Sequence, residues 1–98
     1  MPPLIAFWTK HADVEGPLRA WVAHMRNATW QTPSDIKADF ASASILGNNR
    51  VVFNIKGNDY RLIVAILYPT QSILIKFVGT HAEYDKIDAT TVEIEAGN

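Results

Sequence analysis

Several side chains able to transfer a proton or to donate to an anion gather near the end of the chain, directly after the strand-like run 73–79. They are His81, Tyr84 and Lys86. An unperturbed histidine has a pKa of about 6.5, so His81 is the strongest candidate for proton transfer near neutral pH. Tyr84 and Lys86 are the other candidates for proton transfer. This crowding predicts a reaction site.

A second polar cluster occupies the upstream segment 54–61. Arg61 is its strongest phosphate ligand, because a planar guanidinium can donate two parallel hydrogen bonds. Lys56 and Asn58 flank the same turn and are candidate RNA-binding side chains. RNA cleavage without metal needs a base for the 2′-hydroxyl, cations for the phosphoryl oxygens and an acid for the leaving 5′-oxygen. The two clusters can supply all three, which suggests chemistry on a phosphodiester.

Each cluster also has a purely structural interpretation. A histidine after a strand is often a cap or a surface group, and Lys56 and Asn58 are compatible with ordinary turn chemistry. For Arg61 the alternative is an ion pair with Asp59 or a cross-strand contact with Asn54. Both interpretations stay open from the residues alone.

A helical turn over 81–86 would arrange the downstream cluster. His81 would then share a face with Tyr84 and Asp85, three and four residues later, whereas Glu83 and Lys86 would diverge from it. On that face Asp85 can orient the imidazole.

Composition indicates one small domain spanning residues 1–98. Of its residues 48% are apolar, which is enough for one core, and it has no cysteine for a disulfide, a thiol nucleophile or a cysteine-type zinc site. The N-terminal apolar stretch is too short for a signal peptide or a membrane span. We therefore expect a cytoplasmic protein.

The formal net charge of −1 argues against a strongly basic, non-specific nucleic-acid binder. The charges are unevenly distributed, however. Segment 50–81 holds four Lys and Arg residues against only Asp59, whereas segment 82–98 holds five Asp and Glu residues against only Lys86. A locally basic sheet and an acidic tail are expected.

The first half of the chain favours helices. Leu18, Trp21, Val22 and Met25 follow the spacing of an amphipathic helix, predicted over 17–28 after Pro17. Thr32 with Asp35 three residues later resembles a capping box, which predicts a helix over 33–41. Residues 4–7 are compatible with a short edge strand, and 42–49 with a loop.

The second half favours a meander of strands. Runs 50–56 and 59–68 flank Gly57-Asn58, a two-residue hairpin signal. Alternation then places one set of side chains toward the helices and leaves a polar face, free for a ligand, that carries Arg50, Asn54, Lys56, Asp59 and Arg61. Lys76 in the third strand, 73–79, is expected to join Arg61 there as an RNA-binding side chain. The fold class is α+β, a small antiparallel sheet with N-terminal helices packed on one face.

Several site classes have no sequence support. The three histidines lack ligand spacing, so no metal site is expected, and the chain has neither a phosphate-cradling glycine loop nor a nucleophile elbow.

Three stretches of the chain resemble the HigB toxins of bacterial type II toxin-antitoxin modules, within the RelE-like superfamily. The similarity runs over about residues 21–88 and rests on three segments: 30–37 with Phe40, 50–62, and 79–85. Its most specific motifs are Phe53-Asn54 before the Gly57-Asn58 turn, Tyr60-Arg61 after it, and Thr80-His81 followed by Glu83-Tyr84-Asp85.

This resemblance implies an mRNA interferase, an endoribonuclease that cleaves ribosome-bound messenger RNA and thereby inhibits translation. The implied catalytic set is Arg61 and His81, with Asn58, Tyr84 and Lys86 as helpers, and no cofactor or metal is expected. The implied partners are mRNA, the ribosome and a HigA-type helix-turn-helix antitoxin. No membrane association, and no direct DNA binding by the toxin alone, is expected.

A second hypothesis is a non-catalytic, toxin-like binding module. The superfamily also includes ParE-like gyrase inhibitors, and RNA-cleaving relatives are typically basic, unlike this chain. Such a module would inhibit the ribosome or gyrase, or would serve only to bind an antitoxin. Fold alone does not distinguish these functions.

Overall fold

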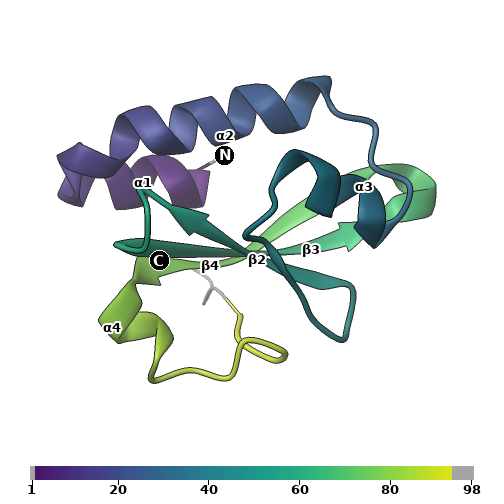
Figure 1. Ribbon diagram of the computed structural model, residues 1–98. Helices are drawn as coiled ribbons and strands as arrows, with labels where there is room; N and C mark the ends of the chain where they lie inside the picture. The colour runs from purple at the N-terminus through teal and green to yellow at the C-terminus, as the bar shows by residue number, and fades with distance from the viewer. Residues whose placement is uncertain (1, 94–98) are drawn as a thin grey trace.

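A computed structural model describes residues 2–93 of the chain. A four-stranded antiparallel sheet separates three N-terminal helices on one side from a short fourth helix and the C-terminal segment on the other (Figure 1). The predicted α+β architecture with helices packed on one face is therefore confirmed. Within residues 2–93 no helix has the length and apolar character needed to cross a membrane.

Helix α1 spans Pro2–Lys10, so the edge strand expected over 4–7 is wrong. Leu4, Phe7 and Trp8 follow the i, i+3, i+4 spacing of one helix face, and Leu4 is fully buried while the intervening Ile5 is half exposed. This helical period prevails over the strand preference of a few apolar residues. A 3₁₀ turn, η1 (Ala12–Val14), then leads into the next helix.

Helices α2 (Glu15–Asn27) and α3 (Pro33–Asp39) confirm the two predicted helices, with α2 beginning two residues earlier than Pro17. Both bonds of the capping box at α3 are present: the Asp35 amide donates to the Thr32 hydroxyl, and the Asp35 carboxylate accepts from the Thr32 amide. These bonds satisfy amides that the first helical turn would leave unpaired.

The strands follow in the order β1-β2-β3-β4: β1 (Ser44–Ile45), β2 (Arg50–Ile55), β3 (Tyr60–Leu67) and β4 (Ser72–Thr80). Two-residue β1 lies within the segment expected to be a loop. Asn54 pairs with Arg61, as the hairpin signal predicted. The 3₁₀ turn η2 (Tyr68–Thr70) connects β3 to β4.

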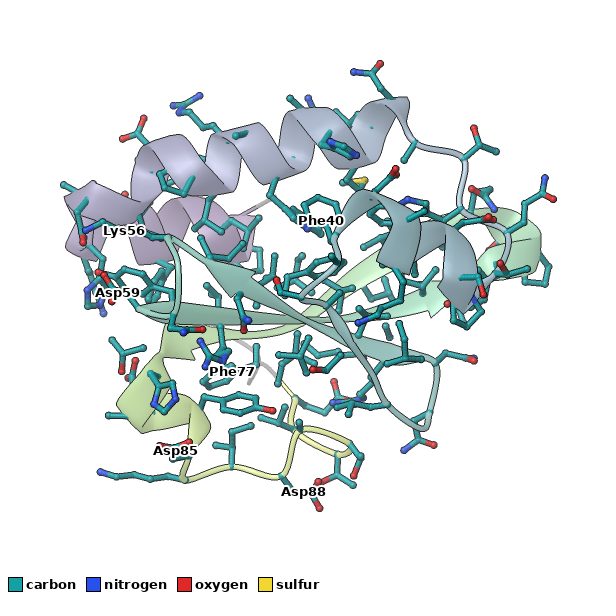
Figure 2. All side chains as sticks on the ribbon, in the orientation of Figure 1. Phe40, Lys56, Asp59, Phe77, Asp85 and Asp88 are labelled. Atoms are coloured by element: carbon teal, nitrogen blue, oxygen red, sulfur yellow. The ribbon has the colours of Figure 1, made fainter. Side chains whose placement is uncertain are left out.

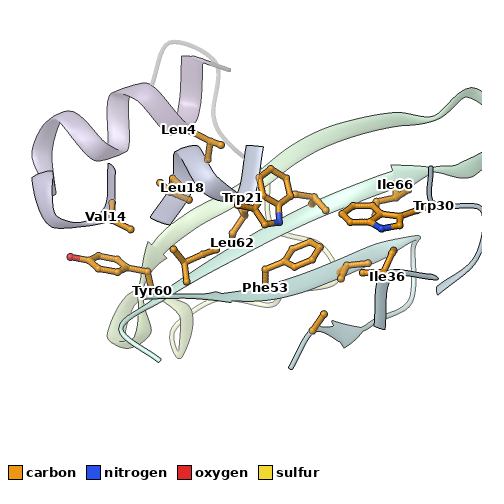
Figure 3. Close-up of a cluster of buried hydrophobic side chains, with 14 residues drawn as sticks. Leu4, Val14, Leu18, Trp21, Trp30, Ile36, Phe53, Tyr60, Leu62 and Ile66 are labelled. Carbon is orange, nitrogen blue, oxygen red and sulfur yellow. The ribbon is translucent and has the colours of Figure 1, made fainter. Parts of the chain in front are cut away.

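The face of the sheet toward α1, α2 and α3, here called the helix face, holds the main core (Figure 3). Phe53 is its centre, since its ring contacts those of Trp21, Trp30 and Phe40. The alternation predicted for β2 and β3 is confirmed, because these strands contribute the buried side chains of Val51, Phe53, Ile55, Tyr60, Leu62, Val64 and Ile66.

A bulge at Lys76 changes the alternation of β4. Val64 pairs with Ile75 and the adjacent Ile63 pairs with Phe77, so Lys76 is the extra residue. Ile75 packs on the helix-face core, whereas Phe77 lies on the opposite side of the sheet (Figure 2). Simple alternation along the predicted strand 73–79 would place both on one face, because it does not anticipate a bulge.

That opposite side, here called the second face, is not the open polar surface that alternation predicted. Residues 85–93, here called the C-terminal segment, run beneath it (Figure 1). Arg50 donates to the carbonyls of Ala89 and Val92, and Asn48 donates to the carbonyl of Thr90. These contacts cover the middle of the second face, where Val52, Ile63 and Ala65 are buried.

Candidate functional site

Helix α4 (His81–Tyr84) begins where β4 ends. A second capping box forms its start: the Glu83 amide donates to the Thr80 hydroxyl, 3.2 Å away, and the Glu83 carboxylate accepts from the Thr80 amide, 2.9 Å away. The His81 amide also donates to the carbonyl of Asp59 in the β2–β3 turn. The turn and the helix are thus joined at one end of the sheet.

His81 and Asp85 form a pair on α4, as the helical-turn prediction required. The His81 Nδ1 lies 3.2 Å from an Asp85 carboxylate oxygen, and both side chains are more than half exposed. Because Nδ1 contacts the carboxylate, Nε2 remains the ring nitrogen available to a ligand. A neutral imidazole that donates from Nδ1 presents an unprotonated Nε2.

Arg61 lies beside α4 on the second face. Its guanidinium carbon is 5.6 Å from the centre of the Tyr84 ring, and its Nη1 donates to the carbonyls of Asn58 and Tyr60. The contacts expected from the structural interpretation, an ion pair with Asp59 or a bond to Asn54, are not those it makes within residues 2–93. As far as residues 2–93 are concerned, Nε and Nη2 remain for a bidentate contact with phosphate.

Gly79 lies opposite Arg61 in the β3–β4 pairing. A Cβ atom at this position would be 2.5 Å from Cζ of Phe77 and 3.1 Å from a Glu83 carboxylate oxygen. Only a residue without a side chain lets the Phe77 ring pack against this strand while Glu83 caps α4. Gly79 therefore shapes the floor beside Arg61.

Two further predicted site residues lie at the same end of the sheet. Lys86 directly follows the α4 region and is exposed, and in the part of the chain that the structure describes it makes no ion pair. Asn58 is exposed in the turn and fixes Arg61 through its backbone carbonyl. The structure thus brings Arg61, His81, Tyr84, Asn58 and Lys86 to one end of the molecule.

Lys56 lies elsewhere, so its predicted place on the polar face is wrong. It has a left-handed backbone (φ 52°), and its ammonium lies 2.8 Å from Asp13 of η1, on the helix side of the sheet (Figure 2). The Tyr60 hydroxyl also donates to Asp13. The bond from Lys56, and then that from Tyr60, lower the pKa of Asp13 below its usual value.

Lys76 does point to the second face, but its neighbour there is Glu93 and not Arg61, which had been expected. Its ammonium is 2.8 Å from one Glu93 carboxylate oxygen, and the other oxygen is 3.0 Å from the Arg50 guanidinium. The bond from Lys76 is the main cause that lowers the pKa of Glu93. Lys76 thus contacts the C-terminal segment rather than the α4 cluster.

Two contributions to the site were absent from the candidate catalytic and binding residues. Asp85 is outside that set, but its direct contact with His81 agrees with the orienting role expected from a helical turn. The capping box of Thr80 and Glu83 was missed, although its signature, threonine followed three residues later by glutamate, is visible in the sequence. No sequence pattern could have linked Asp13 to Lys56, which is 43 positions away.

The geometry offers no metal cage among residues 2–93, where no three His, Asp or Glu side chains gather closely enough to hold an ion. The α4 end instead combines a guanidinium for an anionic oxygen, an imidazole for proton transfer, and a phenol and an ammonium able to donate. These groups match the needs of a phosphoryl transfer in which side chains supply both charge and protons.

One known protein family matches most of the chain. Residues 14–87 match the model of the HigB toxin family, described as the RelE-like toxic component of a toxin-antitoxin system. No curated protein matches the chain.

Proposed function

The chain belongs to the HigB toxin family, whose members are the toxic components of toxin-antitoxin systems, and we propose that its toxic activity is metal-independent cleavage of ribosome-bound messenger RNA. The observation behind this proposal is that Arg61 contacts helix α4. The Arg61 guanidinium lies over the ring of Tyr84. The residue after Tyr84 is Asp85, whose carboxylate contacts His81. The proposed phosphate ligand and the proposed proton-transfer group thus lie at one partly exposed site.

Arg61 would bind the non-bridging oxygens of the scissile phosphate. In the same step, Nε2 of His81 accepts the proton of the adjacent 2′-hydroxyl, and Asp85 stabilises the resulting imidazolium. The 2′-oxygen forms its bond to phosphorus as the bond from phosphorus to the 5′-oxygen breaks. The products are a 2′,3′-cyclic phosphate and a 5′-hydroxyl end.

The leaving 5′-oxygen needs a proton from a second group, since His81 has just accepted one. Tyr84 and Lys86 are the candidates. The position of Arg61 over the Tyr84 ring favours Tyr84, because a phosphate held by Arg61 would lie near that side chain. Lys86 and Asn58 would contact flanking parts of the RNA, and Lys76 is proposed to bind a more distant phosphate.

An antitoxin partner follows from membership in a toxin-antitoxin family. We propose that it is of the HigA type, with a helix-turn-helix domain that supplies the DNA binding that the toxin alone lacks. Cytoplasmic action fits a target on translating ribosomes.

The experiment is induced expression of the wild type, Arg61→Ala and His81→Ala, with primer extension on a defined message and purified ribosomes. His24→Ala is a matched control, because His24 is also a half-exposed histidine beside an aspartate, 3.3 Å from Asp39, but on the helix side. Arg19→Ala on α2 is the control for Arg61. Cleavage that persists in both site variants would exclude the assigned chemistry.

A second candidate function, a non-catalytic toxin that occupies its target, has one observation in its favour. Arg50, Lys56 and Lys76 are all paired with carboxylates within residues 2–93, and this reduces the free positive charge available to RNA. Growth arrest without RNA cleavage, retained in His81→Ala, would support this alternative. Arrest with DNA damage signalling would indicate gyrase as the target.

A further inference from the structure

Two cations of the second face share a single carboxylate. Glu93 contacts Arg50 through one oxygen, at 3.0 Å, and Lys76 through the other, at 2.8 Å. Arg50 comes from β2, Lys76 from the bulge in β4, and Glu93 from the C-terminal segment. Three separate parts of the chain therefore build one anion-binding arrangement.

Exposure distinguishes the carboxylate from the cations that it contacts. The side chains of Arg50 and Lys76 are only 6% and 20% exposed, whereas that of Glu93 is 59% exposed. Glu93 is thus the outer member of the group. The Nη1 atom of Arg50 is already bonded to the carbonyls of Ala89 and Val92, while its Nη2 faces only the carboxylate among the described residues.

A phosphodiester can replace such a carboxylate. Both groups present two anionic oxygens that accept charge-assisted hydrogen bonds from guanidinium and ammonium groups. We propose that Arg50 and Lys76 form a second phosphate-binding site for single-stranded RNA, and that Glu93 occupies this site in the free protein as a competing anion. The inference rests on the proposed function, because it assumes that RNA is the substrate.

The site lies along the same face as Arg61 but at a separate position. Arg61 is opposite Gly79, and Lys76 lies three residues before Gly79 in β4, or roughly 10 Å away at the rise of a β-strand. Lys76 and Arg61 would therefore contact phosphates of different nucleotides. The second site would align the RNA strand across the sheet toward His81.

Displacement of Glu93 also explains how a chain with a negative net charge would bind RNA, which is itself a polyanion. The whole chain has a formal net charge of −1, and its cations on the second face are partly neutralised by its own acidic tail. When RNA replaces Glu93, two cations become available without any change in composition. Affinity for RNA should therefore depend on the Glu93 carboxylate.

The test measures binding of the full chain to a fluorescent single-stranded RNA with 2′-O-methyl groups throughout, which cannot be cleaved. Anisotropy titrations over a salt series compare the wild type with Glu93→Gln. Glu15→Gln is the matched control, because it removes the same charge from an ion pair, 2.7 Å long, with Arg19 on the helix side. Thermal melting checks that each variant is folded.

We expect Glu93→Gln to bind at least about fivefold more tightly, with a plot of log K against log salt that is steeper by about 0.7 for each added phosphate contact. Glu15→Gln should change affinity by less than about twofold, since it alters only the remote charge. Adding Lys76→Ala to Glu93→Gln should abolish the gain in affinity and in slope.

Lys76→Ala in the otherwise wild-type chain is a second test that leaves the C-terminal segment bound to Arg50. It should weaken RNA binding, whereas Lys10→Ala on α1, which removes the same charge elsewhere, should have a smaller effect. Equal affinities of the wild type and Glu93→Gln, an equal gain in Glu15→Gln, or no binding by any variant would overturn the second site.

Failure of the second site can be told apart from failure of the proposed function. If Glu93→Gln binds as the wild type does while Arg61→Ala still abolishes cleavage, only the second site is excluded. If no variant cleaves RNA but Glu93→Gln binds more tightly in a Lys76-dependent way, the second site stands and the nuclease assignment fails.

Discussion

Arg61 lies directly opposite Gly79 in the pairing of β3 with β4. On one strand this pair provides the guanidinium of the proposed site, and on the other it provides a position with no side chain. The vacant volume is filled by the Phe77 ring and by the Glu83 carboxylate that caps α4. Because Gly79 has no side chain, Arg61, the proposed phosphate ligand, and the helix that carries His81 can pack at the same end of the sheet.

Gly79→Ala is expected to destabilise the protein by about 1–3 kcal/mol, because its Cβ would overlap the Phe77 ring and force that ring to move. Urea denaturation measures the change in the free energy of unfolding. Gly16→Ala in α2 is the control, since a Cβ there meets no atom within 4 Å. It should be neutral or stabilising, as alanine is favoured over glycine in a helix.

Thr80→Ala is expected to reduce RNA cleavage as well as stability. Loss of its hydroxyl removes a helix cap worth about 1 kcal/mol and loosens the short helix that holds His81 and Tyr84 near Arg61. Thr32→Ala removes the equivalent cap from α3, on the helix side. If Thr32→Ala loses as much stability as Thr80→Ala but cleaves RNA as the wild type does, the loss of cleavage in Thr80→Ala comes from the site and not from lower stability.

Asp85→Asn is expected to lower kcat for cleavage by about tenfold or more, because a neutral amide stabilises a positively charged imidazole less than a carboxylate does. The melting temperature and KM should stay nearly unchanged, since both side chains of the pair are exposed. Quantitative primer extension at varied ribosome concentrations gives both constants. A loss confined to KM would show that Asp85 contributes to binding rather than to proton transfer.

Stability should fall in acid partly through Asp13. Its pKa in the folded protein is lowered from 3.8, chiefly by the bond from Lys56, so its contribution is present above that value and is lost as the pH falls through the lowered pKa. Urea denaturation between pH 7 and pH 2 should show a flatter pH dependence for Asp13→Asn. Lys56→Gln should also flatten the curve, and a wild-type slope in that variant would contradict the pair.

Local signals in the sequence were sufficient for most of the fold. The periodicity of α2, the capping box of α3 and the Gly57-Asn58 turn act within a few residues, so they predicted elements and the β2–β3 register correctly. The α4 arrangement was equally local, because His81 and Asp85 are one helical turn apart. Where two local signals competed, as in α1, the helical spacing that buries Leu4 prevailed.

The sequence by itself determined the fold class, the family motifs and the types of group at the proposed site. Only the tertiary structure decided which cations are available there. Lys56 is paired with Asp13 and Lys76 with Glu93, because a left-handed turn residue redirects one side chain and a strand bulge and the returning C-terminal segment position the other. Such pairings depend on contacts between distant segments, and alternation along a single strand contains no information about them.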